Sequence, residues 1–217
     1  MRILGKTGLC VNEVGCGGIP IQHVDQYVVN QLIDEMISLG INFIDTARGY
    51  TVSEELIGNA LVGKREKFII ATKSMSRTYD AMKADIDLSL KKLKTDYIDL
   101  YQLHNVSLNE NYSGALRALE EAKQKGIVRH IGITTHSLEM AEKIVEENIF
   151  ETLQFPYNIV EDQGEKLFGL AKEKNILSST KIDTEKLADF DKLKIPPNST
   201  HTLASYEKSI LPLFCIC

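Results

Sequence analysis

FIDTARGY, residues 43–50, is a short apolar run that ends in an acid, Asp45, and is followed five positions later by a phenol, Tyr50. Its first two residues are typical of a buried strand, and the polar residues and glycine after them are typical of a loop. Two later apolar runs end in the same way, FIIATK at Lys73 and YIDLYQLH at His104. The sequence therefore predicts an acid, a phenol, an amine and an imidazole at or just after the ends of consecutive strands.

Strand-like and helix-like segments alternate along the chain, and residues 1–14 have the pattern of a hairpin. We expect strands at 14–18, 43–46, 67–73, 97–104, 130–135 and 151–158, and helices at 25–39, from 53 onward, and at 78–93, 113–125, 137–147 and 161–174. The strands recur at intervals of roughly 20 to 35 residues, which is typical of βα units. In a barrel of such units the carboxyl ends of the strands meet on one face, where the four polar groups can form a site for proton transfer.

The segments FIDTARGY, ATKS and YIDLYQLHN resemble the motifs of the aldo-keto reductases. This resemblance implies an α/β fold of the (β/α)₈ TIM-barrel type, here incomplete, with six recognisable βα units and an N-terminal β-hairpin. It also implies that carbonyls are reduced with NADPH through an Asp, Tyr, Lys, His tetrad. Carried over residue by residue, the catalytic residues are Asp45, Tyr50, Lys73 and His104.

Two further segments resemble the parts of the family that hold the nicotinamide. GITTHS implies cofactor binding by Thr134 and Thr135, although the family usually has Ser then Asn at these two positions, and LQFPYN implies a contact from Gln154. Amide, hydroxyl and carbonyl groups suit a carboxamide because it both donates and accepts hydrogen bonds. Residues 194–200, KIPPNST, resemble the loop that holds the 2′-phosphate of the cofactor.

Each candidate residue also has a structural interpretation when it is taken alone. Asp45 is then a loop cap and Tyr50 a half-buried anchor. Lys73 is a solvated strand end, and His104 is an imidazole with satisfied hydrogen bonds. Gln154 is a polar residue that ends a strand. The occurrence of the four tetrad residue types at consecutive strand ends favours the catalytic interpretation.

Reduction of a carbonyl requires a hydride at carbon and a proton at oxygen, and Tyr50 is the candidate proton donor. A Lys73 ammonium about 4 Å away, at an effective dielectric of about 20, favours the phenolate by about 4 kcal/mol, or roughly three pKa units. We therefore expect Lys73 to lower the pKa of Tyr50 toward neutrality. Asp45 is expected to keep Lys73 charged, and His104 to hold the substrate oxygen.

The alternating pattern ends after residue 177. Residues 178–203 are polar and are interrupted by Pro196 and Pro197, and the 40 residues after residue 177 are too few for two further βα units, which need on the order of 50 to 60. We therefore divide the chain into a barrel-like part, residues 1–177, and an atypical tail that is not an independent domain. Because an open barrel leaves strand edges unpaired, we expect the tail to cover the gap or two chains to form a homo-oligomer.

The composition is ordinary for one globular domain, with 217 residues, of which 43% are hydrophobic and 25% charged. A net charge of -5 gives no electrostatic reason to expect a nucleic acid or an anionic membrane as partner. No apolar run approaches the roughly 20 residues of a membrane span and no signal-peptide pattern begins the chain, so we expect a cytoplasmic protein. Cys10, Cys16, Cys215 and Cys217 are too few for a disulfide framework, and we expect unpaired thiols and no metal site.

The resemblance implies reduction of an aldehyde or ketone to an alcohol, with NADPH as the cofactor, NADH as an alternative, and a small-molecule carbonyl as the substrate. The alternative function is that of a non-catalytic or degenerate family member that acts as a nucleotide-binding or interaction subunit. It is favoured by the missing sequence pattern for strands seven and eight, which complete the cofactor site in the family.

Overall fold

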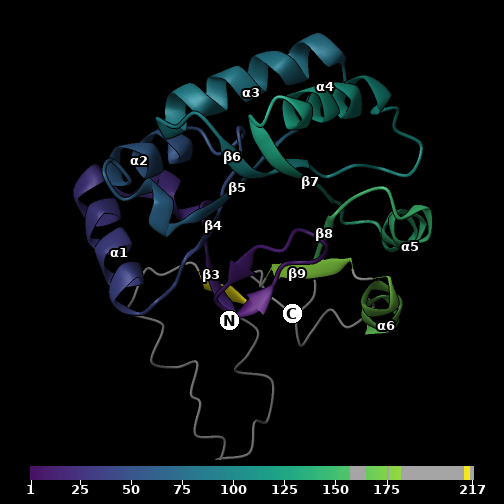
Figure 1. Ribbon diagram of the computed structural model, residues 1–217, viewed down its shortest axis with the longest axis horizontal. Helices are drawn as coiled ribbons and strands as arrows, with labels where there is room; N and C mark the ends of the chain where they lie inside the picture. The colour runs from purple at the N-terminus through teal and green to yellow at the C-terminus, as the bar shows by residue number, and fades with distance from the viewer. Residues whose placement is uncertain (157–164, 175, 182–212, 216–217) are drawn as a thin grey trace, which may run out of the picture.

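The computed structural model describes residues 1–156, 165–174, 176–181 and 213–215. Within them, one curled sheet of eight strands has the order β10, β3, β4, β5, β6, β7, β8, β9 (Figure 1). Strands β3 to β9 pair in parallel, and β10 pairs with β3 in the antiparallel direction. The strands are β3 (Val14–Gly17), β4 (Phe43–Asp45), β5 (Ile69–Ser74), β6 (Ile98–Leu103), β7 (Val128–Thr134), β8 (Thr152–Pro156), β9 (Leu177–Lys181) and β10 (Leu213–Cys215).

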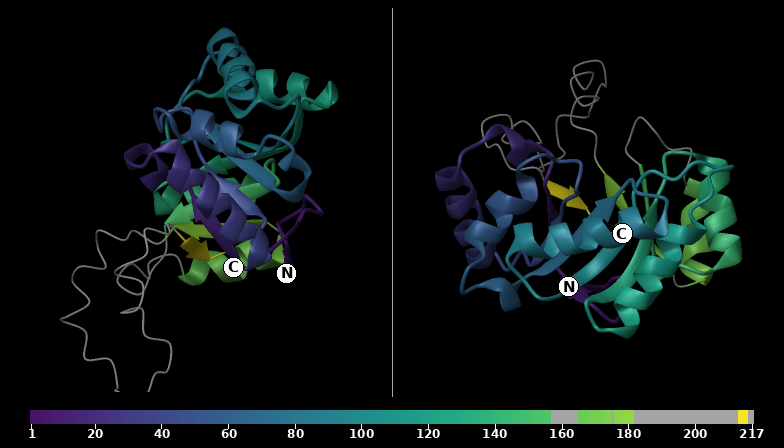
Figure 2. Two further views of the ribbon diagram at one scale, coloured as in Figure 1. Left: turned by 90° about the vertical axis from the view of Figure 1, so that its left-hand side faces the viewer. Right: turned by 90° about the horizontal axis from the view of Figure 1, so that it is seen from above.

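Helices alternate with the strands and lie around the outside of the sheet, as Figure 1 and Figure 2 show. Asp25 caps the first helix by accepting the N–H of Val28 at 3.0 Å, and Ser137 caps the fifth by accepting the N–H of Met140. The helices are α1 (Gln26–Ser38), α2 (Ser53–Ala60), α3 (Tyr79–Leu93), α4 (Ser113–Gln124), α5 (Leu138–Glu147) and α6 (Glu165–Glu173), with short 3₁₀ turns η1 (Pro20–His23) and η2 (Arg65–Lys67). The six predicted βα units and the barrel-type fold are therefore confirmed.

The two outer strands of the sheet are the part of the fold that the sequence pattern does not predict. Strand β9 extends the sheet beside β8, although the sequence LSSTK has no apolar run, because pairing in a ladder depends on backbone groups that every such residue carries. At the other edge β10 pairs with β3, with Leu213 opposite Cys16, and β10 also lies beside β9. Residues 161–164 and 194–200, assigned to the start of a helix and to a phosphate loop, lie outside the described residues.

The N-terminal hairpin packs against strands β4, β5 and β6, at the end of the sheet where these strands begin. Its strands β1 (Arg2–Ile3) and β2 (Cys10–Val11) pair in the antiparallel direction, and Gly5 and Gly8 adopt positive φ values of 53° and 71° in the turn between them. One apolar cluster joins the hairpin to strands β4, β5 and β6 and consists of Leu4, Val11, Phe43, Ala71 and Leu100. The predicted hairpin is thus confirmed, and it covers the end of the sheet opposite to the tetrad residues.

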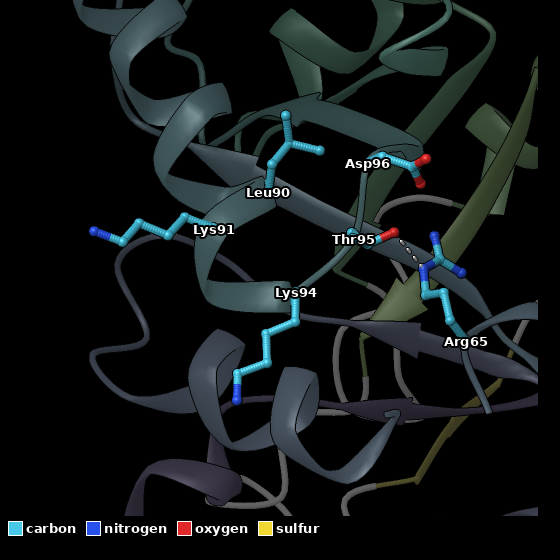
Figure 3. Close-up of a pocket in the computed structure, with 6 residues that line it drawn as sticks. All are labelled: Arg65, Leu90, Lys91, Lys94, Thr95 and Asp96. Atoms are coloured by element: carbon cyan, nitrogen blue, oxygen red, sulfur yellow. Dashed lines mark hydrogen bonds between the residues drawn. The ribbon is translucent and has the colours of Figure 1, made fainter. Parts of the chain in front are cut away.

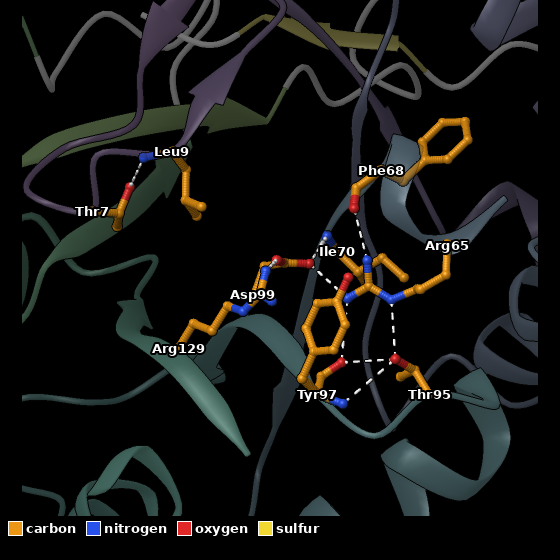
Figure 4. A network of polar contacts seen from close by, with 9 residues as sticks. All are labelled: Thr7, Leu9, Arg65, Phe68, Ile70, Thr95, Tyr97, Asp99 and Arg129. Carbon is orange, nitrogen blue, oxygen red and sulfur yellow. Dashed lines mark hydrogen bonds and ion pairs between the residues drawn. The ribbon is translucent and has the colours of Figure 1, made fainter. Parts of the chain in front are cut away.

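A network of charged residues ties three strands together near the same end (Figure 4). The buried carboxylate of Asp99 lies 2.6 Å from Nη2 of Arg65 and 2.9 Å from Nη1 of Arg129, and it also accepts the N–H of Ile70. The ring of Tyr97 lies between the two guanidinium groups, at 4.1 Å and 3.7 Å from their central carbons. We interpret this network as structural support for the core strands.

A second polar cluster surrounds Glu151, in the loop before β8. Its carboxylate lies 2.6 Å from Nζ of Lys123 and 2.8 Å from Nδ1 of His130, and it accepts the N–H of Ile131 at 3.0 Å. Burial alone would raise the pKa of Glu151, but the three hydrogen bonds outweigh burial and lower the pKa to about 2. The carboxylate is therefore stabilised in its ionised form in the folded chain.

Glu151 should make the free energy of unfolding depend on pH in acid solution. Because its folded pKa is lower than its ordinary value of 4.5, the stabilisation is fully present above about pH 5 and is lost as the pH falls toward 2. We expect Glu151→Gln to be less stable than wild type at pH 6 by about 1–2 kcal/mol, after allowance for the partial exposure of the cluster. Urea unfolding between pH 6 and pH 3 should show this difference shrinking. The exposed Glu146→Gln is the control, and a difference that stays constant with pH would contradict the prediction.

Candidate active site

The four tetrad residues lie at the carboxyl ends of neighbouring parallel strands. Asp45 ends β4, Lys73 lies near the end of β5, and His104 directly follows β6. Tyr50 lies in the loop after β4, and its ring centroid is 5.2 Å from Nζ of Lys73. The rings of Tyr50 and His104 are 5.9 Å apart and meet edge to face at 86°. The structure therefore brings together the four residues that the sequence singled out, as expected for this face of a barrel.

Lys73 and Asp45 form a buried ion pair. The ammonium of Lys73 donates to Oδ2 of Asp45 at 2.5 Å and to the carbonyl of Thr46 at 2.9 Å. Only 2% of Lys73 and 7% of Asp45 are exposed. Because neither charge has much access to water, each depends on the other for its stabilisation. The pair is fixed at the base of the site.

Two glutamine amides complete the surroundings of Asp45. Gln102 Nε2 donates to Oδ1 at 3.1 Å, and Gln154 Nε2 donates to Oδ2 at 3.3 Å. Gln102 was not among the residues singled out by sequence analysis. It stands two residues before His104 in a strand, so the alternation of side chains places both on one face, and this spacing was a signal that could have found it. Strand pairing also sets Gln102 opposite Lys73.

The pKa of Tyr50 differs from the sequence-based expectation. Burial is the larger cause and Asp45 the second, and both raise the pKa of Tyr50 above its ordinary value. The lowering expected from Lys73 is outweighed by burial of the phenol and by the Asp45 carboxylate, which forms an ion pair with the ammonium. Burial and Asp45 likewise raise the pKa of the Cys16 thiol to about 12. The Tyr50 phenol and the Cys16 thiol are therefore both held in their protonated, neutral forms.

The residues that follow Tyr50 and His104 both have left-handed backbone conformations. Thr51 has φ 39° and Asn105 has φ 51°. A positive φ is unusual for any residue with a Cβ and is strained for a β-branched threonine, so the surrounding contacts must hold it. Each of these left-handed residues directly follows a tetrad residue that carries a ring.

The predicted cofactor-binding threonines clamp the loop after His104. Thr134 Oγ1 accepts the N–H of Asn105 at 2.7 Å. Thr135 Oγ1 donates to the carbonyl of Val106 at 2.8 Å and accepts the N–H of Ser137 at 3.1 Å. These contacts give both hydroxyls a structural role beside any contact with a ligand.

Thr134 and Gln154 also form a pair of polar groups that suits a carboxamide. They are direct neighbours in the pairing of β7 with β8, and both are buried. Thr134 Oγ1 uses an acceptor position toward Asn105, which leaves its proton to be donated, and the amide oxygen of Gln154 is an acceptor. The residues present therefore fit a group that both donates and accepts, such as the amide of a nicotinamide.

A surface hollow of about 550 Å³ lies at the opposite end of the sheet (Figure 3). It is lined by Arg65, Leu90, Lys91, Lys94, Thr95 and Asp96, which precede β5 and β6. The guanidinium of Arg65 is already bonded to Thr95 and Asp99, and the two lysine side chains point away from it. The hollow therefore lacks converging polar groups and is unrelated to the tetrad.

A model of the aldo/keto reductase family matches residues 13–178, and the chain belongs to this family. Among curated proteins it is similar to the uncharacterized oxidoreductase YqkF of Bacillus subtilis, with 32% identity over 81% of this chain and 61% of the relative. It is also similar to L-galactose dehydrogenase of Arabidopsis thaliana, with 35% identity over 64% of this chain and 50% of the relative. The chain thus spans between half and two thirds of the length of these relatives.

Solved structures agree with the family assignment. The holo form of an aldo-keto reductase from Bacillus halodurans has 29% identity and a TM-score of 0.79, over 90% of this chain and 69% of that one. An aldo-keto reductase from Klebsiella pneumoniae in complex with NADPH has a TM-score of 0.74 over 88% of this chain and 69% of that one. Because the two sequences are only 22% identical, this similarity shows the fold alone.

No helix among the described residues is both long and apolar enough to cross a bilayer.

Proposed function

We propose that this protein reduces an aldehyde or ketone to an alcohol with NADPH, and that Tyr50 donates the proton. The observation that carries the proposal is the arrangement of a partly buried phenol beside an imidazole and above a buried ammonium and carboxylate pair. Membership of the aldo/keto reductase family supports it. The substrate is a small carbonyl compound, and NADH is the alternative cofactor.

Tyr50 is suited to hold a proton until it is needed. Burial and Asp45 raise its pKa, so the phenol stays protonated across the neutral pH range. An alkoxide that forms at a reduced carbonyl is a much stronger base than a phenolate, and it therefore takes the proton from Tyr50 even when the phenol is a weak acid. The phenolate that remains lies close to the ammonium of Lys73, which stabilises it until it is reprotonated.

His104 and the Asp45 pair have distinct roles in this proposal. The imidazole of His104 meets the edge of the Tyr50 ring, and we assign it a hydrogen bond to the substrate oxygen that orients the carbonyl toward the phenol. Asp45 keeps Lys73 protonated and fixed, because an unpaired buried ammonium tends to lose its proton.

Thr134, Thr135 and Gln154 are the proposed cofactor-binding residues. The Thr134 hydroxyl and the Gln154 amide oxygen hold the carboxamide of the nicotinamide, and Thr135 supports them by fixing the adjoining loop. When bound, the nicotinamide supplies a hydride to the carbonyl carbon. The three residues orient the ring and do not themselves exchange protons.

The proposal is tested by mixing the purified protein with NADPH and reactive aromatic aldehydes. We expect NADPH absorbance to fall in step with formation of the alcohol, measured by chromatography. A separate fluorescence titration measures NADPH binding. Binding without turnover would overturn the enzymatic proposal in favour of a nucleotide-binding subunit, and neither binding nor turnover would overturn both.

A further inference from the structure

The loop that carries Tyr50 is tied to the layer of helices outside the sheet through Arg48. Nη1 of Arg48 donates to Oε2 of Glu54 in the first turn of α2. Only 1% of the Glu54 side chain is exposed, and its second oxygen accepts from Thr72 Oγ1 at 2.7 Å. Thr72 precedes Lys73 in β5. The two oxygens of Glu54 therefore join the Tyr50 loop to the strand that carries the catalytic lysine.

Arg48 has two further connections on the side of β5 and α3. Its backbone N–H donates to the carbonyl of Lys73 at 2.9 Å. Its Nε lies 3.7 Å from Oδ1 of Asp85, whose other oxygen accepts from Ser76 Oγ at 2.6 Å and from Ser74 Oγ. From within the Tyr50 loop, Arg48 thus contacts residues of α2, β5 and α3.

The base of the loop is closed independently. Ser53 Oγ donates to the carbonyl of Gly18 at 3.0 Å and lies 2.9 Å from Thr46 Oγ1. A Cβ on Gly18 would lie 2.7 Å from Thr46 Oγ1, so this corner is tightly packed. The loop between Thr46 and Ser53 is therefore held at both ends. Its middle is held by the Tyr50 N–H, which donates to the carbonyl of Ala47 at 3.0 Å, by Thr51 Oγ1, which donates to Oε1 of Gln22 at 3.1 Å, and by the contacts of Arg48.

We propose that Arg48 and Glu54 are positioning residues, which hold the phenol of Tyr50 over the Lys73 and Asp45 pair without touching the substrate. We call the contacts of Arg48 with Glu54 and Asp85 the Arg48 anchor. The catalytic part of this inference rests on the proposed function. Only Gly49 separates Arg48 from Tyr50, so a displacement of Arg48 moves the phenol with it. Displacements of about 1 Å at a reacting group lower rates by about 10²-fold.

Kinetics of Glu54→Gln test the anchor. The variant keeps the shape of the side chain but removes its charge, and we expect kcat to fall about 10- to 100-fold with little change in KM. Arg48→Met should behave similarly, and Arg48→Lys should recover part of the loss because it keeps one charged contact. In a Tyr50→Phe background neither change should lower kcat further, since the group being positioned is gone.

Glu55→Gln is the matched control for Glu54→Gln. Glu55 is the next residue of α2, but 47% of its side chain is exposed and it pairs with Lys92 on the surface. We expect its kcat to equal that of wild type. Equal losses in the two variants would overturn the inference, because the effect would then come from α2 as a whole.

A measurement without turnover separates this inference from the proposed function. With tyrosines labelled with ¹³C at the hydroxyl-bearing carbon, the NMR signal that is missing in Tyr50→Phe reports on Tyr50. In Glu54→Gln this signal should titrate at lower pH than in wild type, toward an ordinary tyrosine, because the released loop exposes the phenol to water. An unchanged titration would overturn the anchor. Absence of aldehyde reduction by wild type would overturn only the proposed function.

Thr72→Val covers the case in which Glu54→Gln does not fold. It removes one hydrogen bond to Glu54 and leaves the charges paired, so the fold should be retained. We expect a smaller change of the Tyr50 signal in the same direction, and a Tyr50 signal identical to that of wild type would contradict the inference.

Discussion

Tyr50→Phe should lower kcat for aldehyde reduction by about 10²- to 10⁴-fold and leave the fold intact. The change removes a single oxygen, and with it the proposed proton donor. A loss of this size is usual when a general acid is removed. The aromatic ring remains to pack against His104 and Lys73. Steady-state rates with saturating NADPH and aldehyde measure the effect, and thermal unfolding checks the fold.

Tyr27→Phe is the control for this substitution. Tyr27 is 68% exposed on α1, outside the tetrad, and its hydroxyl contacts only Gln31 among the hydrogen bonds of the described residues. We expect its kcat to match that of wild type. If Tyr50→Phe retained wild-type turnover, the assignment of Tyr50 as the proton donor would be wrong, whatever the substrate.

The direction of the Tyr50 pKa shift has a consequence for the pH profile. A phenol whose pKa is raised above its ordinary value stays protonated at neutral and mildly alkaline pH. Tyr50 should therefore cause no loss of kcat between about pH 6 and pH 9. A loss that begins near neutrality and is absent in Tyr50→Phe would instead support the lowered pKa that the sequence suggested.

The sequence predicted the parts of this site that depend on local pattern. Each tetrad residue follows an apolar run, and the convergence of strand ends in a barrel brings such residues together without knowledge of distances. The pKa of Tyr50 could not be predicted in this way. The direction of the Tyr50 pKa shift depends on how deeply the phenol is buried and on how closely Asp45 contacts Lys73. Neither can be inferred from the spacing of residues in the sequence.

Contacts between distant segments were missed for a related reason. Gln102 lies 57 positions after Asp45, and only the register of the strands shows that its amide reaches the carboxylate. Glu54 and Glu55 look equivalent at the start of a helix, where acids are favoured by the helix dipole. Packing against β5 buries the first and leaves the second in solvent. Strand β9 has only Leu177 as an apolar residue, so its sequence does not show the apolar run of a buried strand.

Lys73→Met should cost about 3–5 kcal/mol of the free energy of unfolding in addition to lowering kcat. Lys73 is 2% exposed, and its removal leaves Asp45 as a buried carboxylate whose hydrogen bonds, within the described part of the chain, come from the amides of Gln102 and Gln154. Breaking a buried ion pair from one side is costly because the remaining charge stays desolvated. Urea unfolding at neutral pH measures the loss. Lys92→Met, which breaks the exposed pair with Glu55, should cost no more than about 1 kcal/mol.

The double variant Asp45→Leu with Lys73→Met distinguishes the charge effect from a packing effect. If desolvation of Asp45 causes the loss, removing the second charge should restore stability, because apolar replacement of both partners of a buried pair is often neutral. Activity should stay low, since the Lys73 ammonium is then absent and cannot stabilise a Tyr50 phenolate. A double variant as unstable as the sum of the single variants would mean that the two side chains contribute independently, and the ion pair would then not be the reason for their burial. Recovery of stability without recovery of turnover would separate what the pair does for the fold from what it does for the phenol.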